Sequence, residues 1–425
     1  MITLLIVADD FTGALDTGVQ LAGCGAPTRV VTDPEFSPAN AAGAEVLVID
    51  AETRHLPPSQ AGAIVEGIVR RAVEQKVPYI YKKTDSALRG NVGAELGALL
   101  AASGEKALPF LPAYPQIDRC TRGGVHYIEG RPVAESVFGI DPFEPVRHSD
   151  IAGLIGAQSG VPVHSLPADA PAPEGQGIYV YDASSLADLE RAGQTLAAAG
   201  RLHISAGCAG FGAVLPRLLG LGRAQQPPKP RLDPRLLVVC GSVNPITVAQ
   251  LDAAEEAGFA RLRLTPRQKL EPGYWNTPEG EADRARIEAL LQANPRVLLD
   301  SNDAGGNGPT ADYAAGLGCG LEEMRVRIAS SIGDLVAGLL HSPAVGTLLM
   351  TGGDTLLQVM RCAGVRELEP LCELEKGVVL ARCTYRGCTR HVITKSGGFG
   401  QAALLTDLAA RLEAQAEENR NRSVR

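Results

Sequence analysis

The chain has 425 residues, which is too long for a single hydrophobic core and suits two domains of ordinary size. Its 45% apolar and 21% charged residues are typical of a globular protein. The net charge of −8 is spread over the chain and no lysines or arginines cluster into a basic stripe, so we expect no nucleic-acid partner.

The first eight residues are apolar but lack a basic region and lead directly into Asp9 and Asp10. We expect a buried strand here rather than a signal peptide. No stretch approaches the roughly 18 uninterrupted apolar residues of a membrane span. The nine cysteines are scattered, and the spacing of Cys383 and Cys388 matches no common zinc site. These features predict a cytoplasmic protein with free thiols and no membrane contact.

The first half of the chain alternates between strand and helix patterns joined by short turns. This alternation predicts an α/β domain whose sheet is at least partly parallel, with ligands at the carboxyl ends of the strands. Strands are expected at residues 2–7, 28–32, 46–50, 79–82, 178–181 and 202–205, and helices at 58–75, 150–157 and 184–199.

Residues 109–145 form a long segment with weak periodicity and many prolines and glycines. Such a segment inside a compact domain is usually functional. Residues 125–128 and 131–133 predict a small hairpin around Glu129 and Gly130. We expect His126 within it to be structural.

A polar, proline-rich stretch at residues 225–231 is the expected linker between the domains. We therefore predict domains at 1–225 and 235–425, each with a mostly parallel sheet flanked by helices. In the second domain, strands are expected at 236–240, 296–299 and 391–394, helices at 246–257, 311–340 (with breaks) and 402–412, and a frayed tail at 413–425.

Polar residues follow three predicted strands of the first half. Asp9 and Asp10 end the first strand, where carboxylates can bind hydroxyls, hold a metal or act as a base. One of them could instead only cap the following helix. Arg54, after the second of these strands, could contact a carboxylate with two hydrogen bonds.

The segment after residue 81 is the densest polar stretch of the chain. Its cations could clamp a carboxylate while Asp85 accepts a proton, although a solvated loop is the alternative. The candidate residues are Lys82, Lys83, Thr84, Asp85, Ser86 and Arg89.

Two glycine turns follow apolar strands in the second half. The first contains Gly352, Gly353, Asp354 and Thr355, and a helical pattern comes directly after it. Bare amide groups at a helix N-terminus bind anions, so this turn predicts a phosphate site. A tight turn capped by Asp354 or Thr355 is the alternative.

The second turn, about 40 residues later, contains Gly397 and Gly398, and two such turns suit opposite sides of one nucleotide. Ser242, in a third glycine turn, could hold a phosphate or cap a helix, and Lys395 could counter phosphate charge or face solvent. The chain has neither G-x-x-x-x-G-K-[ST] nor an early G-x-G-x-x-G, which disfavours a Walker-type ATPase and a Rossmann dehydrogenase.

Five motifs together resemble the four-carbon acid sugar kinase family, in the right order and over nearly the whole chain. They are residues 7–14, residues 82–90, Gly241 with Ser242, residues 351–355 and residues 396–400. Members of that family use ATP to phosphorylate acids such as D-threonate, D-erythronate or 3-oxo-tetronate. The resemblance implies an N-terminal acid-sugar domain and a C-terminal nucleotide domain. It places substrate on Asp10 (or Asp9), Arg54, Lys83, Thr84, Asp85 and Ser86, and ATP on Ser242, Gly352, Gly353, Asp354, Thr355 and Gly398.

Residue chemistry and resemblance both indicate phosphoryl transfer to a terminal hydroxyl, with Mg²⁺ neutralising the phosphates. Asp85 or Asp10 would accept the hydroxyl proton, and the sequence does not choose between them. The metal ligands, the acid and the oligomeric state stay open, with a homodimer among the options. A non-catalytic nucleotide or sugar-acid sensor and an NAD-dependent dehydrogenase are the alternative functions.

Overall fold

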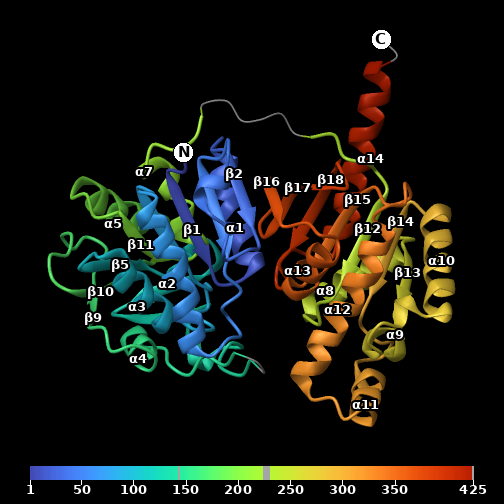
Figure 1. Ribbon diagram of the computed structural model, residues 1–425, viewed down its shortest axis with the longest axis horizontal. Coiled ribbons are helices and arrows are strands. Elements are labelled where there is room, and N and C mark those ends of the chain that lie inside the picture. Colours follow the sequence, from blue (N-terminus) through green and yellow to red (C-terminus); the bar gives the residue numbers. More distant parts are fainter. Residues whose placement is uncertain (142–143, 224–229, 424–425) are drawn as a thin grey trace. The chain divides into compact units, whose positions relative to one another are not determined.

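The computed structural model describes residues 1–141, 144–223 and 230–423. It separates into two compact units, Met1–Pro227 and Pro228–Arg425. Each unit is a sheet covered by helices, which confirms the predicted α/β fold class (Figure 1). The linker expected at residues 225–231 falls mostly outside the described residues.

The main sheet of the first unit has the strand order β2-β3-β1-β4-β11-β5-β10-β9, and all neighbouring strands are parallel. β1 and β3 are buried along their whole length, as expected for parallel strands with helices on both faces. The strands are β1 (Leu4–Ala8), β2 (Thr28–Val31), β3 (Val46–Asp50), β4 (Tyr79–Lys83), β5 (Ala107–Leu111), β9 (Val163–Leu166), β10 (Gly177–Tyr181) and β11 (Ile204–Gly207).

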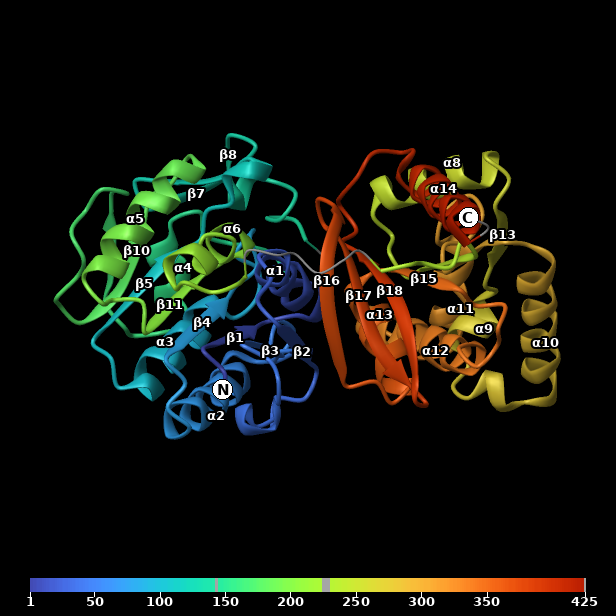
Figure 2. The same ribbon diagram turned by 90° about the horizontal axis from the view of Figure 1, so that it is seen from above.

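Helices cover both faces of this sheet (Figure 2). α2 begins at Pro58, where the missing N–H of proline costs nothing, and it buries Ala61, Val65, Ile68 and Ala72 at helical spacing. α2 and α3 pack together, while α1 packs with α6 and α5 with α7. The helices are α1 (Phe11–Gly23), α2 (Pro58–Glu74), α3 (Val92–Ser103), α4 (Ile151–Gly156), α5 (Leu186–Ala198), α6 (Ala209–Gly212) and α7 (Leu215–Leu218), with a 3₁₀ turn at Pro38–Asn40.

The irregular segment carries a small antiparallel sheet of β6 (Arg119–Arg122), β7 (Val125–Ile128) and β8 (Arg131–Pro132). This confirms the predicted hairpin. Glu129 and Gly130 have φ of 49° and 79°, the left-handed pair that a two-residue hairpin turn requires. Short 3₁₀ turns at Pro115–Ile117 and Val133–Glu135 flank these strands.

The sheet of the second unit has the order β13-β14-β12-β15-β18-β17-β16. It is parallel up to β18, after which β17 and β16 continue it antiparallel as the long ribbon seen in Figure 2. Of the strands β18, β17 and β16, the sequence analysis predicted only residues 391–394, which lie in β18. The strands are β12 (Leu236–Cys240), β13 (Ala260–Arg263), β14 (Arg296–Asp300), β15 (Thr347–Thr351), β16 (Glu367–Glu375), β17 (Val378–Tyr385) and β18 (Cys388–Lys395).

The expectation of a frayed tail at residues 413–425 was wrong for residues 413–423, because α14 continues to Ser423. Residues 424–425 lie outside the described residues. Leu404, Leu405, Leu408 and Leu412 of α14 pack into the core and hold it on the sheet. The other helices are α8 (Pro245–Glu256), α9 (Pro266–Leu270), α10 (Pro278–Ala293), α11 (Gly308–Gly316), α12 (Leu321–Leu339), α13 (Gly353–Cys362) and α14 (Leu404–Ser423), with a 3₁₀ turn at Tyr274–Asn276. Among the described helices, none is long and apolar enough to cross a membrane.

Candidate functional site

The carboxyl ends of β1, β3 and β4 meet at one edge of the first sheet. In the register of these parallel strands, Ala8 lies beside both Asp50 and Lys83. The residues that follow the strands therefore come together. Of the predicted site residues, Asp9, Asp10, Arg54 and Asp85 form one charged cluster.

Arg54 is the centre of this cluster. Its Nη2 lies 2.7 Å from Asp9 Oδ2 and 2.7 Å from Asp10 Oδ1. Its Nε donates to Asp9 at 2.8 Å and its Nη1 donates to Asp10 at 2.9 Å. Burial lowers the pKa of Arg54, but the two aspartates outweigh it and hold the pKa well above its ordinary value. Arg54 thus keeps both carboxylates in place.

The two adjacent aspartates have different partners. Asp10 caps α1 by accepting from the Gly13 N–H at 3.0 Å, so the predicted cap is present. Asp9 is 2% exposed, and its Oδ1 has no hydrogen-bond partner within the described residues. Burial raises the pKa of Asp9, but Arg54 and Lys83 outweigh it, so the carboxylate is charged. Its free oxygen can accept a hydroxyl.

Asp85 is held by two arginines. Arg89 donates to it from Nε at 2.9 Å and from Nη2 at 3.1 Å, and Arg54 Nη2 lies 3.7 Å away. Burial raises the pKa of Asp85, but Arg89 and Arg54 lower it more, and the pKa lies well below its ordinary value. In this arrangement Asp85 is a charged hydrogen-bond acceptor and a weak base.

The two lysines of β4 point to opposite faces of the sheet, as successive strand residues do. Lys83 Nζ lies 3.7 Å from Asp9 Oδ1, in the charged cluster. Lys82 is fully buried and pairs with Glu95 Oε2 at 3.1 Å, and Thr53 donates to the same carboxylate. The structure therefore does not bring Lys82 to the candidate site.

Thr84 and Ser86 also differ in position. Thr84 turns toward β11, where its N–H donates to Gly207 O at 2.8 Å. Ser86 accepts a hydrogen bond from Arg119 Nη1, and its carbonyl accepts from His126 Nε2 at 3.0 Å. Burial lowers the pKa of His126 to about 4, so this imidazole is neutral and structural, as predicted.

Arg119 was missed by the sequence analysis. It lies in the irregular segment, 33 positions from Ser86, and no motif contains it. The length of that irregular segment was the one available signal.

In the second unit, three glycine turns converge at the carboxyl ends of β12, β15 and β18. A Cβ on Gly352 would lie 3.2 Å from the Gly241 carbonyl carbon, and one on Gly397 would lie 2.9 Å from Ser242 Oγ. A larger residue at these positions would fill the space between the turns. The cradle formed by Gly241, Ser242, Gly352 and Gly397 thus brings the predicted nucleotide residues together.

Ser242 does not cap the following helix. Asn244 is the cap of α8, with its Oδ1 accepting from the Ile246 N–H at 3.0 Å. Ser242 Oγ accepts from the Asn244 N–H at 3.2 Å and shapes the turn. The alternative of a capping Ser242 is therefore wrong.

Helix α13 begins at the cradle with no side-chain cap, so its first amides and positive dipole end are available to an anion. Gly352 has φ of 101°, which favours glycine. Asp354 pairs with Arg325, and Thr355 is buried against Gly241. Neither caps the helix, which corrects the alternative of a simple capped turn.

Lys395 forms hydrogen bonds with the backbone of the third turn. Its Nζ donates to Thr247 Oγ1 at 3.1 Å and to the carbonyls of Ser396 and Gly397 at 3.0 and 3.1 Å. Burial lowers its pKa to about 8. The ammonium therefore faces the turn's own carbonyls rather than solvent.

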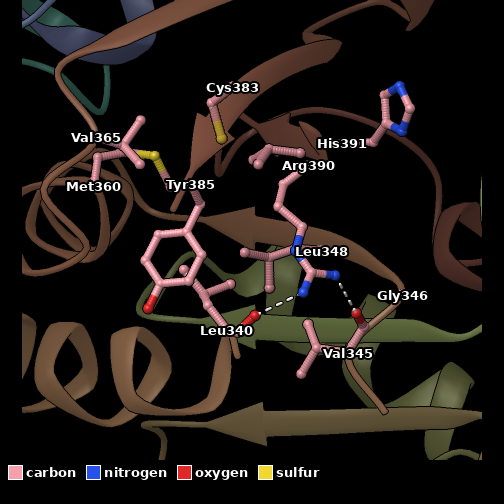
Figure 3. Close-up of a pocket in the computed structure, with 11 residues that line it drawn as sticks. Leu340, Val345, Gly346, Leu348, Met360, Val365, Cys383, Tyr385, Arg390 and His391 are labelled. Atoms are coloured by element: carbon pink, nitrogen blue, oxygen red, sulfur yellow. Dashed lines mark hydrogen bonds between the residues drawn. The ribbon is translucent and has the colours of Figure 1, made fainter. Parts of the chain in front are cut away.

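An apolar recess in the second unit is lined by residues from the first halves of β15 and β18, away from the glycine turns (Figure 3). It is lined by Leu340, Leu348 and Tyr385, and Arg390 closes it by donating to Leu340 O at 2.8 Å and Val345 O at 3.1 Å. Both terminal nitrogens of Arg390 are used within the protein, and the recess lies away from the glycine turns, so we assign no chemistry to it. Among the described residues, no group of three or more His, Cys, Asp or Glu could hold a metal ion.

Comparison with known proteins extends over both units. The chain matches a sugar-binding N-terminal domain at residues 4–215 and a nucleotide-binding C-terminal domain at residues 237–405. It is 30% identical over 429 residues to the D-threonate kinase of Salmonella typhimurium, covering 95% of this chain and 97% of that protein. It is 31% identical over 417 residues to the D-threonate kinase of Bordetella bronchiseptica, covering 94% and 95%.

A solved structure from Salmonella typhimurium LT2, described as a candidate tRNA synthase, shares the fold. Its TM-score is 0.78 at 22% identity, over 97% of this chain and 100% of that chain. At that identity the structural similarity is evidence for a shared fold alone. The two D-threonate kinases match nearly their whole length, which confirms the resemblance carried by the five motifs. The chain belongs to the four-carbon acid sugar kinase family.

Proposed function

We propose that this protein transfers the γ-phosphoryl group of ATP to the terminal hydroxyl of a four-carbon acid sugar. The observation that carries the proposal is the cradle of three glycine turns at the uncapped start of α13. Such a site offers bare amides and a helix dipole to the phosphates. D-Threonate is the first candidate acid because the two relatives compared above, 30% and 31% identical over nearly the whole chain, bear its name, and D-erythronate and 3-oxo-tetronate are the others.

The two units would divide the work, with residues 1–225 binding the acid and residues 235–425 binding ATP. Acid hydroxyls would bind to Asp9, whose Oδ1 accepts no hydrogen bond from the described residues, and to Asp10, with Lys83 3.7 Å from Asp9 Oδ1. The phosphates would lie against Gly352, Gly353, Gly397 and Gly398. Ser242 and Thr355 hold that cradle in shape.

Most of the catalysis would come from positioning and charge stabilisation, because phosphoryl transfer needs little covalent help from the protein. Asp10 also pairs with Arg54, but its side chain is more exposed than that of Asp85, so Asp10 is the better candidate to accept the hydroxyl proton. Asp85 already shares its charge with Arg89 and Arg54, and its lowered pKa makes it a poor base.

Mg²⁺ bound with ATP would neutralise phosphate charge. The donor set fits an ion held mainly by the phosphates and water, because the cluster carboxylates are engaged by arginine and Asp354 by Arg325. The chain's free cysteines fit a reducing compartment, which supports a cytoplasmic enzyme.

The test is to incubate the protein with ATP, Mg²⁺ and a panel of four-carbon acids and to measure ADP and phosphorylated acid. We expect ADP with at least one acid and none without acid. Binding of both ligands without ADP would show a sensor instead. Hydride transfer to NAD with the same acids, and no ADP, would show a dehydrogenase.

A further inference from the structure

An acid substrate needs a cation whose hydrogen-bond donors are not already used. The Nε, Nη1 and Nη2 atoms of Arg54 all contact Asp9 or Asp10. Arg89 spends Nε and Nη2 on Asp85, and its Nη1 lies 3.3 Å from Asp141. These two arginines therefore have no fork left for a ligand.

The two lysines of β4 differ in whether they can donate to a ligand. Lys82 Nζ is taken by Glu95 at 3.1 Å and by the Lys83 carbonyl at 2.9 Å. Lys83 has one long ion pair, to Asp9 at 3.7 Å, so it can donate to a ligand. An ammonium is a point charge, however, and does not grip both oxygens of a carboxylate in a plane as a guanidinium does.

Arg119 is the arginine of this region whose guanidinium still has a pair of donors available to a ligand. Its Nη1 donates to Ser86 Oγ, and within the described residues it forms no ion pair. Its guanidinium lies 5.0 Å from the centre of the Phe138 ring, and that of Arg89 lies 5.2 Å from the same centre. The ring holds the two guanidinium groups in neighbouring positions.

The electrostatics of the region agree with an unpaired cation. Burial lowers the pKa of Arg119, and Asp85 offsets this only in part, whereas the pKa of Arg89 is raised. Burial raises the pKa of the Cys208 thiol, and Lys83, Arg119 and Asp85 all influence it, so these groups surround one place. A half-buried arginine without an anion is costly, and a bound carboxylate would remove that cost.

We infer that Arg119, steadied by Ser86 and Phe138, binds the carboxylate of the acid sugar and sets the preference for acids over neutral sugars. This inference deepens the proposed function and rests on it for the identity of the substrate. The carboxylate end then points toward β6, and the hydroxyl end lies at Asp9, Asp10 and Lys83.

The test compares D-threonate with threitol, which carries a hydroxymethyl group in place of the carboxylate. We expect Arg119→Met to lower kcat/KM for the acid by about 10- to 100-fold, the loss of a charge-assisted hydrogen-bonded pair. Activity with threitol should change less than threefold, so the preference for the acid collapses. Arg119→Lys should keep part of it.

Arg122→Met is the matched control, because Arg122 lies on the same strand but is exposed and donates to Ser184 Oγ at 2.9 Å. It should behave as wild type. An equal loss for acid and threitol in Arg119→Met would show that Arg119 only positions Ser86, and no loss for either would show no role. Both results overturn the inference.

Calorimetric titration of the acid without ATP separates this inference from the proposed function. Acid binding that depends on Arg119 in a protein that makes no ADP would refute the kinase function and keep the carboxylate site. ADP formation with acid binding that is unchanged in Arg119→Met would keep the kinase and refute the site.

Discussion

Gly241 and Thr355 lie so close together that a Cβ on Gly241 would overlap the Thr355 hydroxyl. The turn after β12 is thereby packed directly against the first turn of α13. Two segments more than one hundred residues apart in the sequence thus build one cradle, which has no room for a side chain at Gly241.

We expect Gly241→Ala to force these turns apart. Overpacking of this kind costs about 1–3 kcal/mol of stability, and the displaced amides should weaken ATP binding at least tenfold. Calorimetric titration with ATP and thermal unfolding would measure the two effects. Gly316→Ala, where nothing lies within 4 Å of the added carbon, is the control and should bind ATP normally. Normal ATP binding by Gly241→Ala would contradict the cradle.

Gly352 allows a second test of the cradle. Its φ of 101° disfavours any side chain, and so does the φ of 68° at Gly364, which follows α13 at its other end. We expect Gly352→Ala and Gly364→Ala each to lose roughly 1 kcal/mol or more of stability through the backbone, and Gly352→Ala to lose more because its Cβ would also lie 3.2 Å from the Gly241 carbonyl carbon. Only Gly352→Ala should also lose ATP affinity. Equal ATP affinities in the two variants would place the nucleotide elsewhere.

The pH dependence of ATP binding should report on Lys395. Its pKa of about 8 means that the ammonium loses its proton in mildly alkaline solution, and with it one of its three hydrogen bonds, two of which go to the turn and one to Thr247. We expect ATP affinity to fall by roughly tenfold between pH 7 and pH 9.5, the loss of a charge-assisted bond. In Lys395→Met this change should disappear, and a variant that kept the wild-type profile would exclude Lys395 as its source.

Stability should respond to Lys395 in the opposite direction. The folded-state pKa of about 8 is lower than the unfolded value of about 10.4, so the unfolded chain binds more protons between these pH values. The free energy of unfolding of wild type relative to Lys395→Met should therefore rise as pH increases from 8 to 10. Urea unfolding at both pH values measures this difference.

The strands of the fold were largely predictable from the sequence because parallel strands buried on both faces appear as continuous apolar runs. The expected strands at 46–50 and 236–240 match β3 and β12. β16 was missed because its exposed glutamates interrupt the apolar pattern. The sequence signal for the β17–β18 hairpin was Gly387 between two runs of strand-forming residues. Arg386 and Gly387 form the turn between these strands, with φ of 47° and 79°.

Of the candidate site, the sequence predicted only the residues that directly follow buried strands. Polar residues after buried strands identified Asp9, Arg54 and Asp85, because parallel strands bring their carboxyl ends to one edge. The sequence could not show that Arg54 would be bound by two aspartates, since such pairs form in space. Arg119 reaches the cluster from a distant segment that has no motif, and only the folded chain places it beside Ser86.

Lys82 and Glu95 should behave as a structural pair. Burial raises the pKa of Glu95 and Lys82 compensates only in part, so removing the lysine leaves a costly buried acid. We expect Lys82→Met to lose about 3–5 kcal/mol of stability, and Lys82→Met with Glu95→Leu to regain most of it. Acid affinity in the double variant should stay within a few-fold of wild type. A stable double variant that fails to bind the acid would return Lys82 to the substrate site.

Arg54 should be needed both for folding and for binding the acid. Arg54→Ala leaves the 2% exposed Asp9 and the neighbouring Asp10 without their shared cation, which should cost about 3–5 kcal/mol of stability. Arg54→Lys keeps the charge but cannot donate to both carboxylates at once, so it should fold better and still bind the acid at least tenfold more weakly. Titrations of both variants with acid and with ATP, below their unfolding temperatures, test this. ATP affinity should be unchanged, because the cradle is built from residues of the second unit alone, and equal losses for both ligands would contradict the division of work between the units.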